Sequence, residues 1–424
     1  MNTHWISGMT VLSALALGGC SGGDDVPVRE ASTRCDHGRM TTYQVARDLI
    51  DAAGVVADGD DRFLLFSRNI LNDRVRGGVV VIDHSGKIAR QYPSPSDRLP
   101  FIQDAAFGAD HQAVLSGTIP DPSGNAAQAW IGKLAADFSL QWEALVGLPN
   151  SGQVVVQALP DGGAIAAGSV LQPDPGWISQ PGATSPPAEA STADEGANVF
   201  LVRIGADGQV LWERDVYLNT SNTSSLRKPP ASLVIGADDR LRFIVETQDG
   251  LVLISTDLDG GDQTLKVLDT RLALHLAGAA QLPDGRLALA SNRGDGTGVT
   301  PSAILTLIDA DGAVLWEKIY GQVGGTMVLG IAYDSALDQI LLSGGTNAAN
   351  WKVADGWLTG VDVNGTVTWS LERGRIDSVR YTSDFGAGSG LARVAVAPDG
   401  TALATGAVSN DLRYYLVGKQ ACHE

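Results

Sequence analysis

Short apolar runs alternate with tight-turn residues along most of the chain. A Pro-Asp-Gly turn at 160–162, 283–285 and 398–400 follows one apolar run and precedes another. Pro presets φ and Gly supplies a positive φ, so each turn predicts a hairpin between two strands. Looser copies of the turn occur at 57–59, 108–110, 236–238 and 334–336. Helical periodicity is absent, which predicts an all-β protein.

A second hairpin pattern falls later in each unit. Asp-Gly or Asn-Gly stands between two apolar runs and a Trp follows, at 204–212, 308–316 and 361–369, with a looser copy at 134–142. Asp-Gly and Asn-Gly between β-rich runs are strong hairpin signals. Each unit therefore holds four strands, which for the sixth unit we place at 328–332, 339–343, 357–361 and 366–370.

Units of four strands that recur every ~50 residues are typical of propeller blades. We therefore predict one β-propeller, with seven four-stranded blades as the natural count and six or eight left open. The repeated residues Trp142, Trp212, Trp316 and Trp369 then occupy equivalent blade positions, which favours packing within or between blades over ligand stacking.

The N-terminus has the form of a secretory signal. Its apolar run at 11–17 is too short to span a bilayer, and it ends in Leu-Gly-Gly-Cys at 17–20. This ending resembles the lipobox of bacterial lipoproteins, in which Cys20 becomes the lipidated, typically palmitoylated, first residue. The alternative is an ordinary signal peptide cleaved elsewhere. By the same resemblance, Ser21 after the cysteine permits export to the outer membrane.

These features divide the chain into three parts. We expect a lipoprotein signal peptide over 1–19, the lipidated cysteine with a flexible tether over 20–34, and a single propeller over 35–424. Length alone would favour two or three domains, but the internal repeats override that expectation.

The two ends of the mature chain fit one closure scheme. The last unit has only three strands, the third at 413–417, and the segment 42–47 can supply the missing outer strand. This pairing would close the ring and leave fewer exposed edges. Cys35 and Cys422 would then lie side by side, and an exported protein favours a disulfide between them. Two unpaired thiols are the alternative.

The stretch Asp-Ala-Asp-Gly-Ala-Val-Leu-Trp-Glu-Lys at 309–318 resembles the repeats of bacterial outer-membrane lipoprotein propellers with PQQ-like (BamB-like) or related repeats. The resemblance implies a lipid-anchored module in the cell envelope that binds or scaffolds other molecules. It leaves two alternatives, a BamB-like envelope assembly factor and an enzyme acting on a glycan or lactone at the channel mouth. The adjacent cysteine pair of the quinone enzymes of this fold is missing, so we expect no such cofactor.

Catalytic motifs are scarce. The histidines after the signal region are scattered without metal-ligand spacing, and no Gly-x-Ser-x-Gly elbow occurs. Carboxylates from different repeats could still meet in the central channel, because such a site needs no motif in the sequence. The sequence thus favours binding over catalysis, with no cofactor except a weak Ca²⁺ candidate at Asp257, Asp259 and Asp262, whose oxygens suit a hard cation. The alternative there is a hairpin turn that uses Asp and Gly for backbone reasons.

Charge limits the partners. Lys and Arg number 30 against 48 Asp and Glu, a net charge of −18, which argues against nucleic acid and against anionic lipid. Contact with the membrane is therefore expected through the lipid anchor only.

Long insertions should gather on one face, where second strands connect to third strands and blade connects to blade. Several arginines and aromatic residues fall in those segments. We predict ligand contacts there, with an envelope protein or an anionic glycan as the partner, from Arg68, Arg74, Arg76, Trp177, Arg293, Trp351, Arg373, Arg375, Arg380 and Tyr381. The alternative is that these are merely solvated charges.

Overall fold

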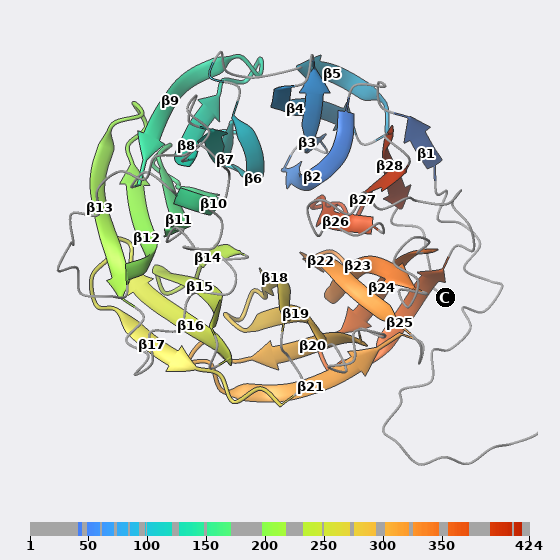
Figure 1. The fold of residues 1–424 in the computed structure, drawn as a ribbon. Coiled ribbons are helices and arrows are strands. Elements are labelled where there is room, and N and C mark those ends of the chain that lie inside the picture. The colour runs from blue at the N-terminus through green and yellow to red at the C-terminus, as the bar shows by residue number, and fades with distance from the viewer. Residues whose placement is uncertain are drawn as a thin grey trace, which may run out of the picture.

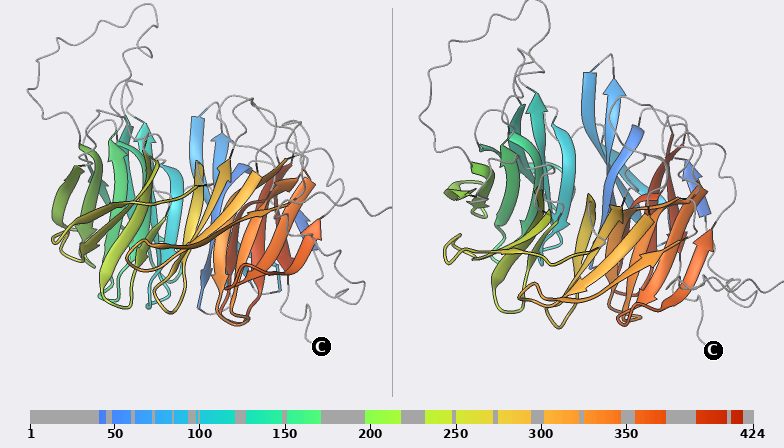
Figure 2. Two further views of the ribbon diagram at one scale, coloured as in Figure 1. Left: turned by 90° about the horizontal axis from the view of Figure 1, so that it is seen from below. Right: turned by 60° about the horizontal axis from the view of Figure 1, so that its bottom comes forward.

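The computed structural model describes the strands and tight turns of the chain. The described residues are 41–44, 49–59, 62–71, 74–83, 85–92, 98, 100–120, 127–147, 151–170, 197–217, 232–247, 250–271, 275–293, 302–321, 325–346, 355–372, 391–408 and 411–417. Their strands form seven four-stranded antiparallel sheets, here numbered in chain order. Figure 1 shows the sheets arranged around a central axis, and Figure 2 shows them edge-on. The predicted all-β propeller with four-stranded blades is confirmed.

The first four sheets are formed by consecutive strands. Sheet 1 contains β2 (Leu49–Asp58), β3 (Arg62–Leu71), β4 (Arg74–Asp83) and β5 (Ile88–Tyr92). Sheet 2 contains β6 (Phe101–Phe107), β7 (Ala113–Pro120), β8 (Ala127–Leu134) and β9 (Leu140–Val146). Sheet 3 contains β10 (Ser151–Ala158), β11 (Ala164–Val170), β12 (Ala197–Ile204) and β13 (Val210–Tyr217). Sheet 4 contains β14 (Leu233–Ile235), β15 (Arg240–Thr247), β16 (Gly250–Asp257) and β17 (Thr264–Val267).

The last three sheets include the only one among these seven that joins distant parts of the chain. Sheet 5 contains β18 (His275–Gln281), β19 (Leu287–Arg293), β20 (Ser302–Ile308) and β21 (Val314–Tyr320). Sheet 6 contains β22 (Thr326–Asp334), β23 (Gln339–Thr346), β24 (Asp355–Asp362) and β25 (Val367–Glu372). Sheet 7 contains β26 (Leu391–Val396), β27 (Ala402–Val408), β28 (Asp411–Val417) and β1 (Thr41–Gln44).

β1 pairs with β28 in antiparallel register, with Thr41 opposite Leu416 and Gln44 opposite Arg413. The predicted segment 42–47 therefore overlaps the strand that completes sheet 7. Sheet 7 also packs on sheet 1, since Leu403 and Ala395 share a buried cluster with Phe63. Among the described residues no helix is long and apolar enough to cross a membrane.

The core is divided into clusters between neighbouring sheets. Each cluster combines buried side chains of two sheets, as where Val155 and Leu201 of sheet 3 meet Phe243 and Ile254 of sheet 4. Central strands such as β23 are buried along their whole length. Strands buried on both faces read as continuous apolar runs, which is the pattern that the sequence shows.

The four repeated tryptophans pack against the buried clusters between neighbouring sheets. A Cβ on Gly208, in the last turn of sheet 3, would lie 2.9 Å from the Trp142 side chain of sheet 2. Trp212 packs on Gly260 of sheet 4 in the same way. Both glycines have positive φ, 83° and 71°, so they satisfy the turn and the packing together. The predicted packing role of these tryptophans is confirmed.

The inner hairpins carry a bulge close to the axis. The register between first and second strands shifts in sheets 1, 2, 3, 5, 6 and 7. The bulge brings the inner backbone close to its partner strand, where a Cβ on Gly344 would lie 1.8 Å from the carbonyl oxygen of Met327. Bulges bend a strand and redirect side chains, and here they shape the wall of the channel.

Candidate functional site

The central channel holds a cavity of about 180 Å³. Its wall consists mainly of the inner strands, and most of the side chains there are small or apolar. Asp104 on β6 and Arg393 on β26 are the two ionisable residues of this lining. In Figure 1 the strands β6 and β26 lie on either side of β2, which contacts both.

Asp104 and Arg393 occupy the same place in their sheets. Each follows the bulge of its inner strand, Asp104 opposite Ser116 and Arg393 opposite Thr405. The corresponding positions of sheets 1, 5 and 6 hold Gly54, Gly278 and Gly330. One carboxyl and one guanidinium thus stand at the same level of a channel that is otherwise lined at this level by small or apolar residues.

The Asp104 carboxyl is held by the neighbouring sheet. Its Oδ2 accepts a hydrogen bond from the backbone N–H of Val156, at 3.0 Å. Burial raises the pKa of Asp104 to about 6, because the charged form loses water, while the Val156 hydrogen bond and the charge of Arg393 partly oppose this shift.

The Arg393 guanidinium reaches past sheet 6 to sheet 5. Its Nη1 donates to the carbonyl oxygen of Ala277 at 3.3 Å. Gly330 allows this route, because a Cβ there would lie 2.7 Å from the Cα of Arg393. Burial lowers the pKa of Arg393 and the charge of Asp104 opposes the change. Among the ion pairs of the described residues, none at 4.0 Å or less joins Arg393 to Asp104.

Side-chain to backbone hydrogen bonds hold the channel wall. They join successive sheets close to the axis: Gln103 Oε1 accepts from Val154 N at 2.9 Å, Ser232 Oγ accepts from Ala279 N at 2.9 Å, and Asn292 bonds both the N–H and the C=O of Val328 at 2.8 and 2.7 Å. Such bonds fix neighbouring inner strands against each other, so the two charges stand on a rigid support.

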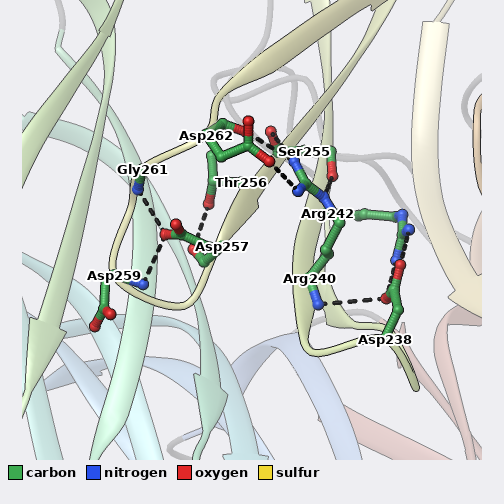
Figure 3. A network of polar contacts seen from close by, with 9 residues as sticks. All are labelled: Asp238, Arg240, Arg242, Ser255, Thr256, Asp257, Asp259, Gly261 and Asp262. Carbon is green, nitrogen blue, oxygen red and sulfur yellow. Dashed lines mark hydrogen bonds and ion pairs between the residues drawn. The ribbon is translucent and has the colours of Figure 1, made fainter.

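A second polar cluster lies at the turn end of sheet 4, beside a crevice of about 380 Å³ (Figure 3). Arg242 bonds both oxygens of Asp238, at 2.8 and 2.5 Å, and its Nε donates to Ala310 O of sheet 5 at 3.1 Å. The Arg242 hydrogen bond lowers the pKa of Asp238 to about 2. Arg240 donates to Asp262 Oδ2 at 2.6 Å and to Ser255 Oγ at 2.9 Å. These charges are matched within the chain, and they link sheet 4 to sheet 5.

The three aspartates of the calcium prediction are directed to separate partners. Asp257 Oδ1 accepts from the N–H groups of Asp259 and Gly261, at 3.0 and 2.6 Å, as in an Asx turn (Figure 3). Asp259 contacts Arg203 at 3.3 Å, and Asp262 contacts Arg240. In the described part of the chain no group of three His, Cys, Asp or Glu is placed to hold a metal. Calcium binding here stays a prediction.

The predicted loop-face residues are partly visible. Arg68 lies in β3, and Arg74 and Arg76 lie in β4, so the expected first-unit loop is instead a long hairpin with only residues 72 and 73 between its strands. Arg293 is exposed at the end of β19. The other predicted functional positions lie outside the described residues: Cys20, Cys35, Trp177, Trp351, Arg373, Arg375, Arg380, Tyr381 and Cys422.

Our sequence reasoning missed the channel charges. A signal was present, because Asp104 and Arg393 each stand six residues before the aspartate of their turn, Asp110 and Asp399. A charge at that offset in an otherwise apolar inner strand differs from the Gly278 of the equivalent unit. Only the tertiary structure shows that the two positions face one cavity.

Comparison of the sequence finds no matching protein-family model and no matching curated protein. Solved propeller structures resemble the fold. They include the Dos1 propeller (TM-score 0.45, 11% identity, 83% of this chain and 74% of that one) and the β-propeller domain of the Trilobed protease from Pyrococcus furiosus (0.46, 9%, 90% and 95%). Sqt1 from Chaetomium thermophilum is also similar (0.48, 11%, 86% and 81%).

Proposed function

We propose that this chain is a non-catalytic, lipid-anchored binding or scaffolding module of the bacterial cell envelope, placed at the outer membrane. Its scaffold is a seven-bladed ring closed by the N-terminal strand. Two observations support closure: β1 completes the sheet of β26–β28, and Phe63 of sheet 1 packs with Leu403 of sheet 7. A closed ring is rigid, which suits a module that presents fixed groups to a ligand.

The observation that carries the binding role is the channel cavity with its two separate charges. A guanidinium recognises carboxylate or phosphate oxygens, and a carboxylate recognises a cation. Asp104 and Arg393 are held by backbone groups of other sheets rather than by each other. Charges oriented in this way recognise a ligand without further change of the wall, which lowers the entropic cost of binding.

The anchor is tested by Cys20→Ala. We expect the variant to be unacylated and to move from the membrane fraction to the soluble fraction, because the acyl chains are the proposed attachment. Incorporation of a fatty-acid probe, followed after fractionation, measures this outcome. Cys422→Ala serves as the matched control and should keep the label. Labelling of the Cys20→Ala variant would contradict the anchor.

The partner is tested by crosslinking whole envelopes and capturing the protein. The proposed partner is an envelope protein or an anionic glycan, bound by the arginine-bearing segments. We expect the triple variant Arg373→Ser, Arg375→Ser, Arg380→Ser to lose most of the captured material, because arginine forks bind anionic groups, while its melting temperature stays within a few degrees of wild type. Unchanged capture by the triple variant would remove these residues from the interface. Capture of outer-membrane assembly proteins would identify a BamB-like role.

A further inference from the structure

The axial cavity presents two opposite charges that are not paired with each other. A guanidinium has five N–H donors, and within the described part of the chain the Arg393 side chain donates one hydrogen bond, to Ala277 O at 3.3 Å. The Asp104 carboxyl accepts from the backbone N–H groups of Val156 and Ala105, and because a carboxylate offers about four lone-pair sites, further acceptor capacity remains among the described contacts. Both side chains line the same cavity. The channel therefore retains unused donors at one side of β2 and unused acceptors at the other.

We propose that this cavity binds a small zwitterion of the amino-acid type, with its carboxylate on Arg393 and its ammonium group on Asp104. The inference rests on the proposed binding function and names the ligand class of the channel. A zwitterion satisfies both charges at once, whereas a simple anion leaves Asp104 unmatched and a simple cation leaves Arg393 unmatched.

The size of the cavity supports a small ligand. Its volume of about 180 Å³ is below the roughly 300–1,000 Å³ of pockets for drug-sized molecules. A free amino acid with a small side chain matches that space.

The rest of the wall supports a ligand with a short apolar part. Val55, Ala105 and Ala106 come from sheets 1 and 2, Leu233 and Val234 from sheet 4, and Ile331 and Val394 from sheets 6 and 7. Gln157 and Ser232 belong to the same lining, and polar atoms make up most of the surface that the cavity exposes, which suits a small ligand whose two ends are charged.

Calorimetric titration of the purified full chain tests the proposal. The probes are glycine, L-alanine, L-serine and L-valine, with sodium acetate and methylammonium chloride as half-ligands that carry one charge each. We expect at least one amino acid to bind with Kd of about 1 mM or tighter and both half-ligands to bind at least tenfold more weakly.

Variants locate the binding. Arg393→Gln and Asp104→Asn should each weaken amino-acid binding at least tenfold, whereas Arg393→Lys, which keeps the charge and loses the fork, should fall between wild type and Arg393→Gln. Arg214→Gln and Asp215→Asn remove the same charges from the exposed outer strand β13 and should leave Kd unchanged. Thermal melting of each variant shows that it is folded.

Three results would overturn the proposal: no amino acid of the panel binds, acetate binds as tightly as the amino acids, or Asp104→Asn leaves their Kd unaltered in a folded protein. These results are distinct from a failure of the proposed function. Capture of an envelope partner uses the crosslinked cell, so it can succeed when the titration shows no zwitterion in the channel.

Discussion

Replacing Gly344 by Val is expected to lower the free energy of unfolding by about 3 kcal/mol or more. A Cβ at this position would lie 1.8 Å from Met327 O and 3.0 Å from the Cα of Val328, both in the backbone of the paired strand β22. A side chain therefore has to push two hydrogen-bonded strands apart, and it cannot rotate away from a backbone atom. β22 is an inner strand, so the displacement would also open the channel wall.

Thermal and urea denaturation of the variant, followed by near-ultraviolet circular dichroism, measure this loss. Gly59→Ala is the matched control, because its Cβ would make only an ordinary contact, 3.5 Å from the His111 ring. We expect that change to cost no more than about 0.5 kcal/mol, as exposed substitutions usually do. Equal stability of the two variants would show that the close approach at the bulge does not constrain the fold.

Asp104→Asn is expected to stabilise the protein at pH 7. The folded state raises the pKa of Asp104 from 3.8 to about 6, so its favourable contribution is fully present below pH 4 and is lost as the pH rises through 6. At 1.36 kcal/mol per pKa unit, the stability of the variant relative to wild type should grow by up to roughly 3 kcal/mol between pH 4 and pH 7. Asparagine keeps an oxygen that can accept from Val156 N, so the local structure has no reason to change.

Urea unfolding of wild type and variant at several pH values between 4 and 7 measures this difference. Asp215→Asn on the exposed strand β13 is the matched control, because it makes the same substitution at a side chain that is not buried. A flat difference for Asp104→Asn would contradict the burial of an ionised carboxyl in the channel. A group that weakens the fold while lining a cavity is a common feature of binding sites, since function often opposes stability.

The hairpins and their order follow from local chemistry, and most of them were predictable. Gly208 and Gly365 adopt positive φ in Asp-Gly and Asn-Gly turns, as that composition requires. For the sixth unit, the four predicted strands coincide with β22 to β25 to within a few residues. Turn chemistry and apolar runs act over fewer than ten residues, so a single sequence carries them in full.

The local sequence pattern did not predict the hairpin that contains Arg68, Arg74 and Arg76. Asn72-Asp73 suits a turn, but the arginines on both sides interrupt the apolar pattern of a strand, so we predicted a loop. The strands β3 and β4 nevertheless extend to Leu71 and Arg74, which pair opposite each other. Strand pairing continues beyond the apolar run that predicts each strand, because backbone hydrogen bonding across the sheet does not depend on side-chain polarity.

The burial of Lys133 and the position of Asp104 and Arg393 in one cavity are decided by the tertiary structure alone. Lys133 is buried because Asp110 of its own sheet and Gly162 O of the next sheet both accept from its Nζ at 2.7 Å. Asp104 and Arg393 are separated by most of the chain, and tertiary packing, such as that of sheet 7 against sheet 1, brings them to one cavity. Turns and strands depend on neighbours along the chain, whereas the burial and pairing of a charge depend on which blades come to lie beside it.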